Sequence, residues 1–300
     1  MATQTGGLFY LIGSDMEHKR RPGPDRGDKM RGRGDKPFRP RQDQRPRPQE
    51  KREYGSDRPR FDFPLIPDEI TAEDLHISVR AQLKTLSPEN QEMVARHLQM
   101  VAMLIDVDPA LAHRHALAAS KKAGRIAVVR ETLGVTAYTT GDFTLALREL
   151  HTHRRISGSN DQLPLIVDSE RGLGRPQKAL EAVVGIDRNK LDVGVRINLA
   201  IALSGARLDL GQLALAKQEL QIKELSPKRI FEQSPLLFRS YAEVLRELGE
   251  DDAEWEDLAD RAEKALEQAQ GEELSLIEEI EIPVKKPRRE IPKRDGRDRG

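Results

Sequence analysis

The stretch LGVTAYTTGDFTLALREL, residues 133–150, decides the predicted fold of this chain. Gly141 divides it into two segments. A glycine permits the turn out of a first helix, because it adopts left-handed backbone conformations at little steric cost. Ala146 lets a second helix approach the first closely, and the large aliphatic side chains of Leu133 and Leu150 fill the seam between them. The stretch therefore predicts a helical hairpin.

The same arrangement recurs along the chain. Four glycines stand at intervals of 33, 37 and 38 residues: Gly141, Gly174, Gly211 and Gly249. Around the first three glycines, three further positions agree. A large aliphatic residue stands eight residues before the glycine (Leu133, Ile166, Leu203), and an alanine stands five residues after it (Ala146, Ala179, Ala216). Another aliphatic residue stands nine residues after it (Leu150, Val183, Leu220). In the fourth copy, an insertion is needed before Ala259 or Ala262 fills the small position. One hairpin cannot bury its own apolar face, so such units stack.

These residues resemble the tetratricopeptide repeat, in a form typical of bacterial proteins. The resemblance implies an all-α protein. The first copy matches best, through Leu133, Gly134, Gly141, Phe143 and Ala146. The second has Pro176 where an aromatic is usual, and the third has Leu213. The resemblance covers roughly residues 88–265 and implies helix-hairpin repeats that form a right-handed superhelix.

The resemblance also implies a protein-interaction scaffold, in which first-helix residues on the concave face contact a partner peptide. The positions that correspond in this chain are Glu131, Val135, Tyr138, Asp168, Arg171, Asn198 and Ile201. This set is mixed in charge, and it does not reproduce the Lys/Asn cluster with which family members hold a C-terminal carboxylate. For each residue the alternative interpretation is ordinary helix surface.

Helix start signals support the all-α interpretation. Thr71 precedes an acidic first turn, and Leu75, Val79 and Leu83 follow at a spacing that places them on one apolar face. Proline is favoured at the first position of a helix, and a capping residue stands before it in Ser87-Pro88, Asp108-Pro109, Ser226-Pro227 and Ser234-Pro235. We therefore expect a first helix and linker in residues 61–87 and a repeat domain in residues 88–270.

The formal net charge is zero, but it averages unlike segments. Residues 17–60 contain 16 basic and 8 acidic residues, and residues 283–300 contain 8 and 3. The segment from Phe61 to Ile282 contains 26 basic and 38 acidic residues. The two basic segments are rich in Arg, Pro, Gly and Asp and poor in aromatics, so they cannot bury enough apolar surface to offset the entropy of ordering. We expect disordered arms at residues 1–60 and 271–300.

The basic arms allow three interpretations. In the first, guanidinium groups bind RNA phosphates with counterion release, through Arg31, Arg33, Arg39, Arg41, Arg45 and Arg47. In the second, the arms are solubilising polyampholytes, because interleaved aspartates halve their charge. In the third, they fold back onto the acidic middle of the chain.

The first 16 residues contain an apolar patch from Leu8 to Ile12, without a preceding positive charge or an A-x-A cleavage site. They do not read as a signal peptide. A short docking segment is one interpretation; the other is a translation-start artefact, with Met16 or Met30 as the true start. The longest uncharged apolar run, residues 6–14, is too short to span a bilayer.

Residue patterns that carry chemistry are absent from the sequence. The chain has no cysteine, which excludes disulfides and thiolate chemistry and fits a reducing, cytoplasmic location. It has no nucleotide-binding or catalytic motif that we recognise, so we expect neither a cofactor nor an enzyme. The pairs His113/His115 and His151/His153 point about 200° apart on a helix and cannot chelate one metal. We therefore predict a non-enzymatic scaffold, with an RNA- or ribosome-associated protein as the alternative.

Overall fold

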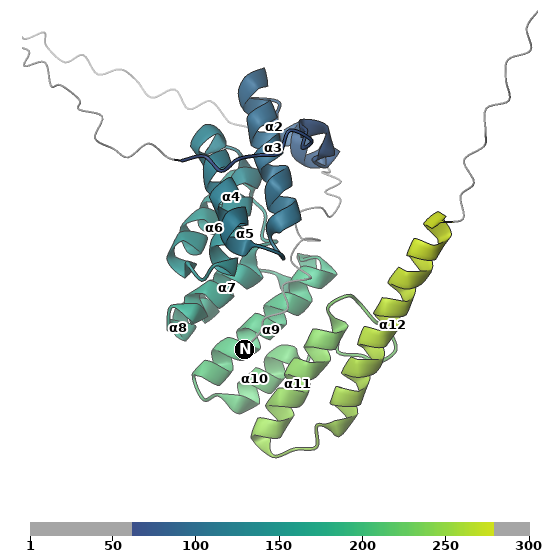
Figure 1. Cartoon of the computed structure of the whole chain (residues 1–300). Helices are drawn as coiled ribbons and strands as arrows, with labels where there is room; N and C mark the ends of the chain where they lie inside the picture. The colour runs from purple at the N-terminus through teal and green to yellow at the C-terminus, as the bar shows by residue number, and fades with distance from the viewer. Residues whose placement is uncertain (1–61, 279–300) are drawn as a thin grey trace, which may run out of the picture. The chain divides into compact units, whose positions relative to one another are not determined.

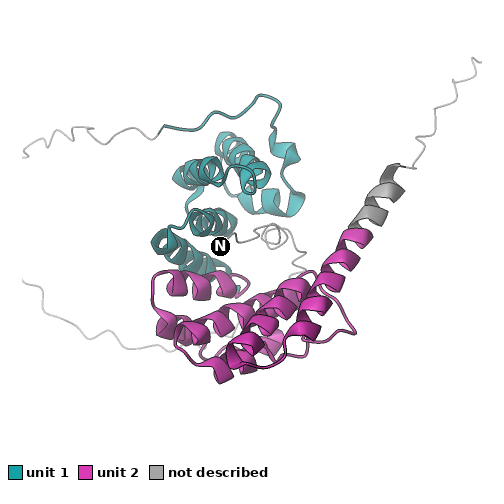
Figure 2. Cartoon of the chain, turned by 60° about the horizontal axis from the view of Figure 1, so that its bottom comes forward, with its two compact units in different colours: residues 1–159 teal, residues 160–300 magenta. Residues whose placement is uncertain are grey.

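The computed structural model describes residues 62–278, with side chains as far as residue 269, and this part of the chain contains helices and no strand. It divides into two compact units, the first ending at Ser159 and the second beginning at Asn160 (Figure 2). The repeat pattern of the sequence predicts one repeat domain over residues 88–270 and does not predict this division. Residues 1–60 and 279–300 lie outside the described residues, and with them Leu8–Ile12 and the candidate RNA-binding arginines. Residues 271–278, which were predicted to begin the disordered C-terminal arm, instead continue the last described helix.

The first unit begins with a short 3₁₀ helix and continues with α-helices. Their bounds are η1 Ala72–Asp74, α2 Ile77–Leu83, α3 Pro88–Leu104, α4 Pro109–Ala123, α5 Ala127–Thr139 and α6 Phe143–Ser157. From α3 onward each helix packs against the next along the chain, as successive antiparallel helices joined by short turns do (Figure 1).

The second unit contains three helical hairpins. Its elements are α7 Leu163–Gly172, α8 Pro176–Glu181, η2 Arg188–Lys190, α9 Val193–Asp209, α10 Leu213–Leu220, α11 Ser234–Leu248 and α12 Ala253–Glu278. The first helices of successive hairpins also touch one another, α7 against α9 and α9 against α11, while α8 and α10 each pack on the first helix that follows. Helices α7, α9 and α11 therefore share one layer.

Three of the five predicted helix starts are confirmed within one residue. Helices α3 and α4 begin at Pro88 and Pro109, and Asp108 accepts a hydrogen bond from the backbone N–H of Leu111 at 3.0 Å. Helix α11 begins at Ser234, one residue before the predicted first position.

Two starts differ from the prediction. Thr71 caps only the three-residue η1, and the chain leaves the helix at Leu75 before α2 begins; Leu75, Val79 and Leu83 are nevertheless all buried. The prediction at Ser226-Pro227 is wrong, since these residues lie in the loop between α10 and α11. Within that loop the Ser226 hydroxyl accepts from the backbone of Lys228 at 3.4 Å, a local bond typical of turns.

The four aligned glycines end the first helix of four hairpins in the same way. Each has a positive φ, between 69° and 81°. In every case the glycine N–H donates to the carbonyl three residues back and the next N–H donates to the carbonyl five residues before it, as in Gly141 to Tyr138 at 3.0 Å and Asp142 to Ala137 at 2.9 Å. This is the Schellman arrangement, which satisfies the last carbonyls of a helix. The alignment of the sequence on these glycines is therefore correct at the level of the backbone.

The aligned alanines and aliphatics fill the hairpin interiors. Ala146, Ala179 and Ala216 are completely buried, and Ala259 and Ala262 are buried in the fourth hairpin. The aliphatic positions before and after the glycines are also buried: Leu133, Leu150, Ile166, Val183, Leu203 and Leu220. Close helix packing needs small side chains at contact points and large ones beside them, and the repeat supplies both.

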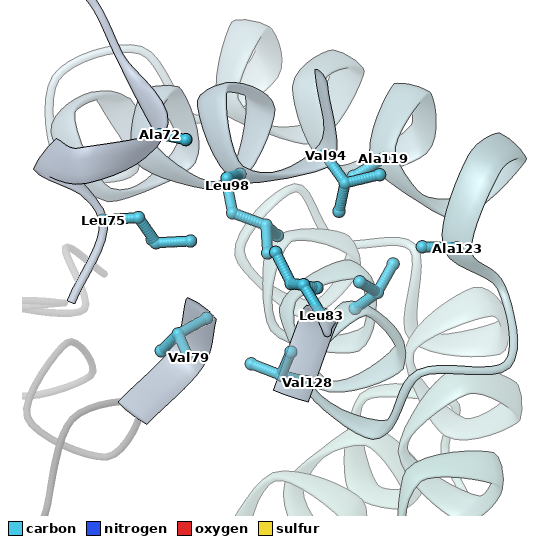
Figure 3. Packing of buried hydrophobic residues seen from close by; sticks show 11 residues of the cluster. Ala72, Leu75, Val79, Leu83, Val94, Leu98, Ala119, Ala123 and Val128 are labelled. Carbon is cyan, nitrogen blue, oxygen red and sulfur yellow. The ribbon is translucent and has the colours of Figure 1, made fainter. Parts of the chain in front are cut away.

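The first unit has a core that η1 and α2 help to close. Figure 3 shows Leu75, Val79 and Leu83 directed towards Leu98 of α3 and Val128 of α5. Among the residues that the structure describes, no helix combines the length and apolar character needed to cross a membrane.

Candidate functional site

The predicted partner-binding residues of the first unit are largely withdrawn from the surface. Val135 is 1 % exposed and Glu131 is 9 % exposed, with its Oε1 3.9 Å from Nε2 of His153. Tyr138 is half-buried, and its ring stands 5.8 Å from the ring of Phe143 across the hairpin turn. Glu131 and Tyr138 therefore contact α6 within the hairpin, and Val135 is part of the core.

Two predicted residues of the second unit belong to an ion-pair cluster between α7 and α9. Arg171 donates from Nη1 to Asp168 at 2.7 Å, and from Nε and Nη2 to the two carboxylate oxygens of Asp209 at 2.8 and 3.3 Å. A Cβ on Gly205 would lie 2.3 Å from the Arg171 guanidinium carbon, so the glycine leaves the space that this group occupies. Burial opposes the charge of Arg171, but its two carboxylate partners prevail and raise its pKa.

Asn198 and Ile201 lie on α9, the middle helix of the layer formed by α7, α9 and α11 (Figure 1). Both are half-buried, and Ile201 packs against the apolar core shared by α9, α11 and α12. The Asn198 amide has no hydrogen bond within the described residues. Of the seven predicted positions, Asn198 is the one that leaves a polar group available on this layer.

The histidines are held in structural contacts. His113 Nδ1 lies 3.0 Å from the Thr136 hydroxyl, and His153 Nδ1 lies 3.1 Å from the carbonyl oxygen of Ala127. Residues 62–269 hold no group of three or more His, Asp or Glu side chains placed to bind a metal ion.

A buried histidine pair is a feature that the sequence analysis missed. His97 of α3 and His115 of α4 are 2 % and 0 % exposed, and their Nδ1 atoms are 2.9 Å apart. One of the two must carry the proton that the other accepts. Burial, followed by the nearness of His115 and Arg96, lowers the pKa of His97 to about 4, and burial lowers the pKa of His115.

Buried glutamates are the second feature that the sequence did not reveal. Glu149 of α6 is 1 % exposed and accepts hydrogen bonds from Arg130 at 2.5 Å and Arg148 at 2.9 Å. Glu224, in the loop after α10, is 3 % exposed and pairs with Arg196 of α9. No local sequence signal marks either glutamate, since each is paired with an arginine of another element.

Each of the two units contains a pocket. The first, about 190 Å³, is mostly apolar and lies between η1, α2, α3 and α5 against Leu75, Leu98 and Val128. The second, about 260 Å³, lies at the start of α9 and is lined by Val193, Arg196, Lys223, Glu224, Ser226, Arg229 and Phe231. Only the second brings several charged groups together.

Comparison with known proteins adds no relative. No family model matches the chain, and neither the curated proteins nor the solved structures contain a match.

Proposed function

We propose that this chain is a non-enzymatic protein-interaction scaffold built on tetratricopeptide-like repeats. The observation that carries the proposal is the identical helix-ending turn at Gly141, Gly174, Gly211 and Gly249, each followed by a second helix with a buried alanine. A repeated turn with a repeated small contact gives repeated hairpin geometry, which is the physical basis of a helical solenoid. The right-handed superhelix and the cytoplasmic location belong to the same proposal.

The layer of first helices in the second unit is the proposed binding surface. Helix α9 lies between α7 and α11 there and packs against both. Asn198 offers both a donor and an acceptor to an extended peptide, whose backbone needs both. Repeat proteins bind through such extended faces.

The test is affinity purification of the full chain followed by mass spectrometry, with Asn198→Arg as the informative variant. Gln218→Arg is the matched control, because Gln218 is an exposed amide on the second helix α10. The proposal expects one partner to be enriched by the wild-type chain and by Gln218→Arg and lost from Asn198→Arg. Equal recovery by all three proteins would exclude this layer as the binding surface.

Association with RNA is the second candidate, and the separation of charge along the sequence favours it. The 16 basic residues in residues 17–60 would bind phosphates, and such binding weakens steeply as salt concentration rises. A chain without residues 17–60 should then lose RNA binding at low salt. If that chain binds RNA as well as the full chain does, the second candidate is wrong.

A further inference from the structure

The pocket at the start of α9 is built around a buried ion pair. Arg196 is 7 % exposed and donates to Glu224 Oε1 from Nε at 3.0 Å and from Nη2 at 2.5 Å. Its Nη1 donates to the backbone carbonyls of Leu191 at 2.9 Å and Arg188 at 3.5 Å. A guanidinium has five N–H donors, so these four bonds fix the group and leave one Nη2 donor.

Glu224, which lines this pocket, retains an unused acceptor. Its Oε1 takes both bonds from Arg196, whereas its Oε2 is buried and accepts no hydrogen bond from the described residues. A buried acceptor without a donor is destabilising, and the cost is larger for a charged group. The pocket therefore favours a ligand that brings a hydrogen-bond donor to Glu224 Oε2.

The charge of the pocket favours an anionic ligand. Arg196, Lys223 and Arg229 contribute three positive charges to its lining, against the single negative charge of Glu224. Lys223 and Arg229 are exposed, and the Arg229 guanidinium lies 5.1 Å from the centre of the Phe231 ring. Val193, the first residue of the 17-residue α9, also lines the pocket, so the positive end of a helix dipole lies at its wall.

We infer that this pocket binds the monoprotonated form of a phosphomonoester. Such a group is an anion that keeps a P–OH donor, and its second pKa near 6 makes this form available close to neutral pH. The P–OH donates to Glu224 Oε2, while the remaining oxygens accept from Arg196, Lys223 and Arg229. The pocket volume of about 260 Å³ far exceeds the roughly 10–15 Å³ that one water needs, so it has room for a tetrahedral anion.

The requirement for a donor separates this ligand from two related anions. Sulfate has the same shape and more charge, but it carries no proton near neutral pH. An internal phosphodiester of RNA also lacks a P–OH group, so the pocket does not read the RNA backbone. This site goes beyond the proposed scaffold function and does not depend on it.

The test compares phosphate with sulfate by isothermal titration calorimetry on the full chain at matched ionic strength. Basic arms attract both anions, so the ratio of the two affinities reports on the pocket. We expect phosphate to bind at least about tenfold more tightly than sulfate, which corresponds to one charged hydrogen bond. Affinity for phosphate should rise as pH falls from about 8 to about 6, while that for sulfate stays unchanged.

Three variants locate the effect, with circular dichroism to check that each is folded. Glu224→Gln should bring the phosphate-to-sulfate ratio to within about twofold of unity, because the amide can donate to either anion. Arg229→Ala should weaken phosphate binding several-fold. Lys228→Ala is the matched control, since Lys228 is an exposed cation next to Arg229 that does not line the pocket, and it should leave binding unchanged.

The source of the phosphoryl group is resolved by comparing inorganic phosphate with a phosphoserine peptide and with adenosine monophosphate. Tighter binding of the peptide assigns the pocket to a phosphorylated side chain, and tighter binding of the nucleotide assigns it to a small metabolite. Equal affinity of phosphate and sulfate in the wild-type chain, or the same ratio in Glu224→Gln, overturns the proposal. If Glu224→Gln does not fold, the wild-type chain provides the test: a phosphate-to-sulfate affinity ratio that does not rise as pH falls from about 8 to about 6 overturns the proposal.

Discussion

Gly134 of α5 lies directly against Leu150 of α6, so that a Cβ on Gly134 would stand only 2.6 Å from Leu150 Cδ2. Leu150 is completely buried, so its side chain can move aside only by displacing other atoms of the core. The glycine therefore sets how closely the two helices of the first aligned hairpin approach. In a helix interior glycine is about 1 kcal/mol less favourable than alanine, and this contact explains why it is found there.

We expect Gly134→Ala to destabilise the protein by about 1–3 kcal/mol, despite its gain in helix propensity. The measurement is the midpoint of urea unfolding followed by circular dichroism. The control is the same substitution in a Leu150→Ala background, where the added methyl group meets a cavity and should no longer destabilise. Equal effects of Gly134→Ala in the two backgrounds would show that Leu150 is not the constraint.

Gly205→Ala should have a smaller effect, because its added Cβ meets the end of a flexible side chain. The added methyl group displaces the Arg171 guanidinium from Asp168 and Asp209, which lowers stability. The higher helix propensity of alanine raises it. We expect the free energy of unfolding to change by less than about 1 kcal/mol at low salt. Near 1 M salt, where charges are screened beyond about 3 Å, the lost ion pairs matter less and the variant should become more stable relative to the wild type.

Gly194→Ala is the control for this salt dependence. Gly194 is also on α9, but its added Cβ would lie 3.3 Å from the uncharged amide of Gln233. Its effect on the urea midpoint should be the same at both salt concentrations. A similar salt response in the two variants would argue against a role for the Arg171 cluster.

Gly141→Val tests the hairpin turn itself. No atom lies within 4 Å of a Cβ added to Gly141, so the cost arises from its φ of +81° and not from a clash. We expect a loss of about 1 kcal/mol or more in the free energy of unfolding. Gly141→Asn should lose less, since asparagine tolerates this conformation better. If both variants are neutral, the turn does not depend on glycine.

The parts of the fold that the sequence predicts are those with a local physical requirement. A positive φ after a helix favours glycine at Gly141, Gly174, Gly211 and Gly249 regardless of what packs nearby. Proline at the first position of α3 and α4 is likewise a local backbone preference. Ser226-Pro227 carries the same local signal but lies in a loop, and its neighbour Glu224 is bound to Arg196, 28 residues earlier in the chain.

The candidate sites depend on distant partners, and for that reason they could not be read from local patterns. His97 meets His115 across a helix pair, and Glu149 meets Arg130 in the same way. Asp168 and Arg171 were predicted as partner-contacting residues of a concave face, with ordinary helix surface as the alternative. The structure joins them to Asp209, 38 residues after Arg171, which no repeat register reveals.

The His97–His115 pair gives the first unit a pH-dependent stability. The pKa of His97 is lowered to about 4 in the folded chain, against an ordinary value of 6.5, so the unfolded chain binds more protons between these values. Stability is therefore retained above about pH 6.5 and lost as pH falls towards 4. One proton can contribute a slope of up to about 1.4 kcal/mol per pH unit.

The measurement is the urea midpoint of the full chain at intervals from pH 7 to pH 4. His97→Leu/His115→Leu is the matched variant, because removing both partners leaves no unpaired buried nitrogen. The carboxylates are common to the two proteins, so the difference between their slopes isolates the pair. We expect a shallower slope in the double variant, because it has no imidazole whose protonation is opposed by burial and, to a smaller extent, by Arg96 and Arg114. Identical slopes would mean that the histidines titrate as freely in the folded chain as in the unfolded one.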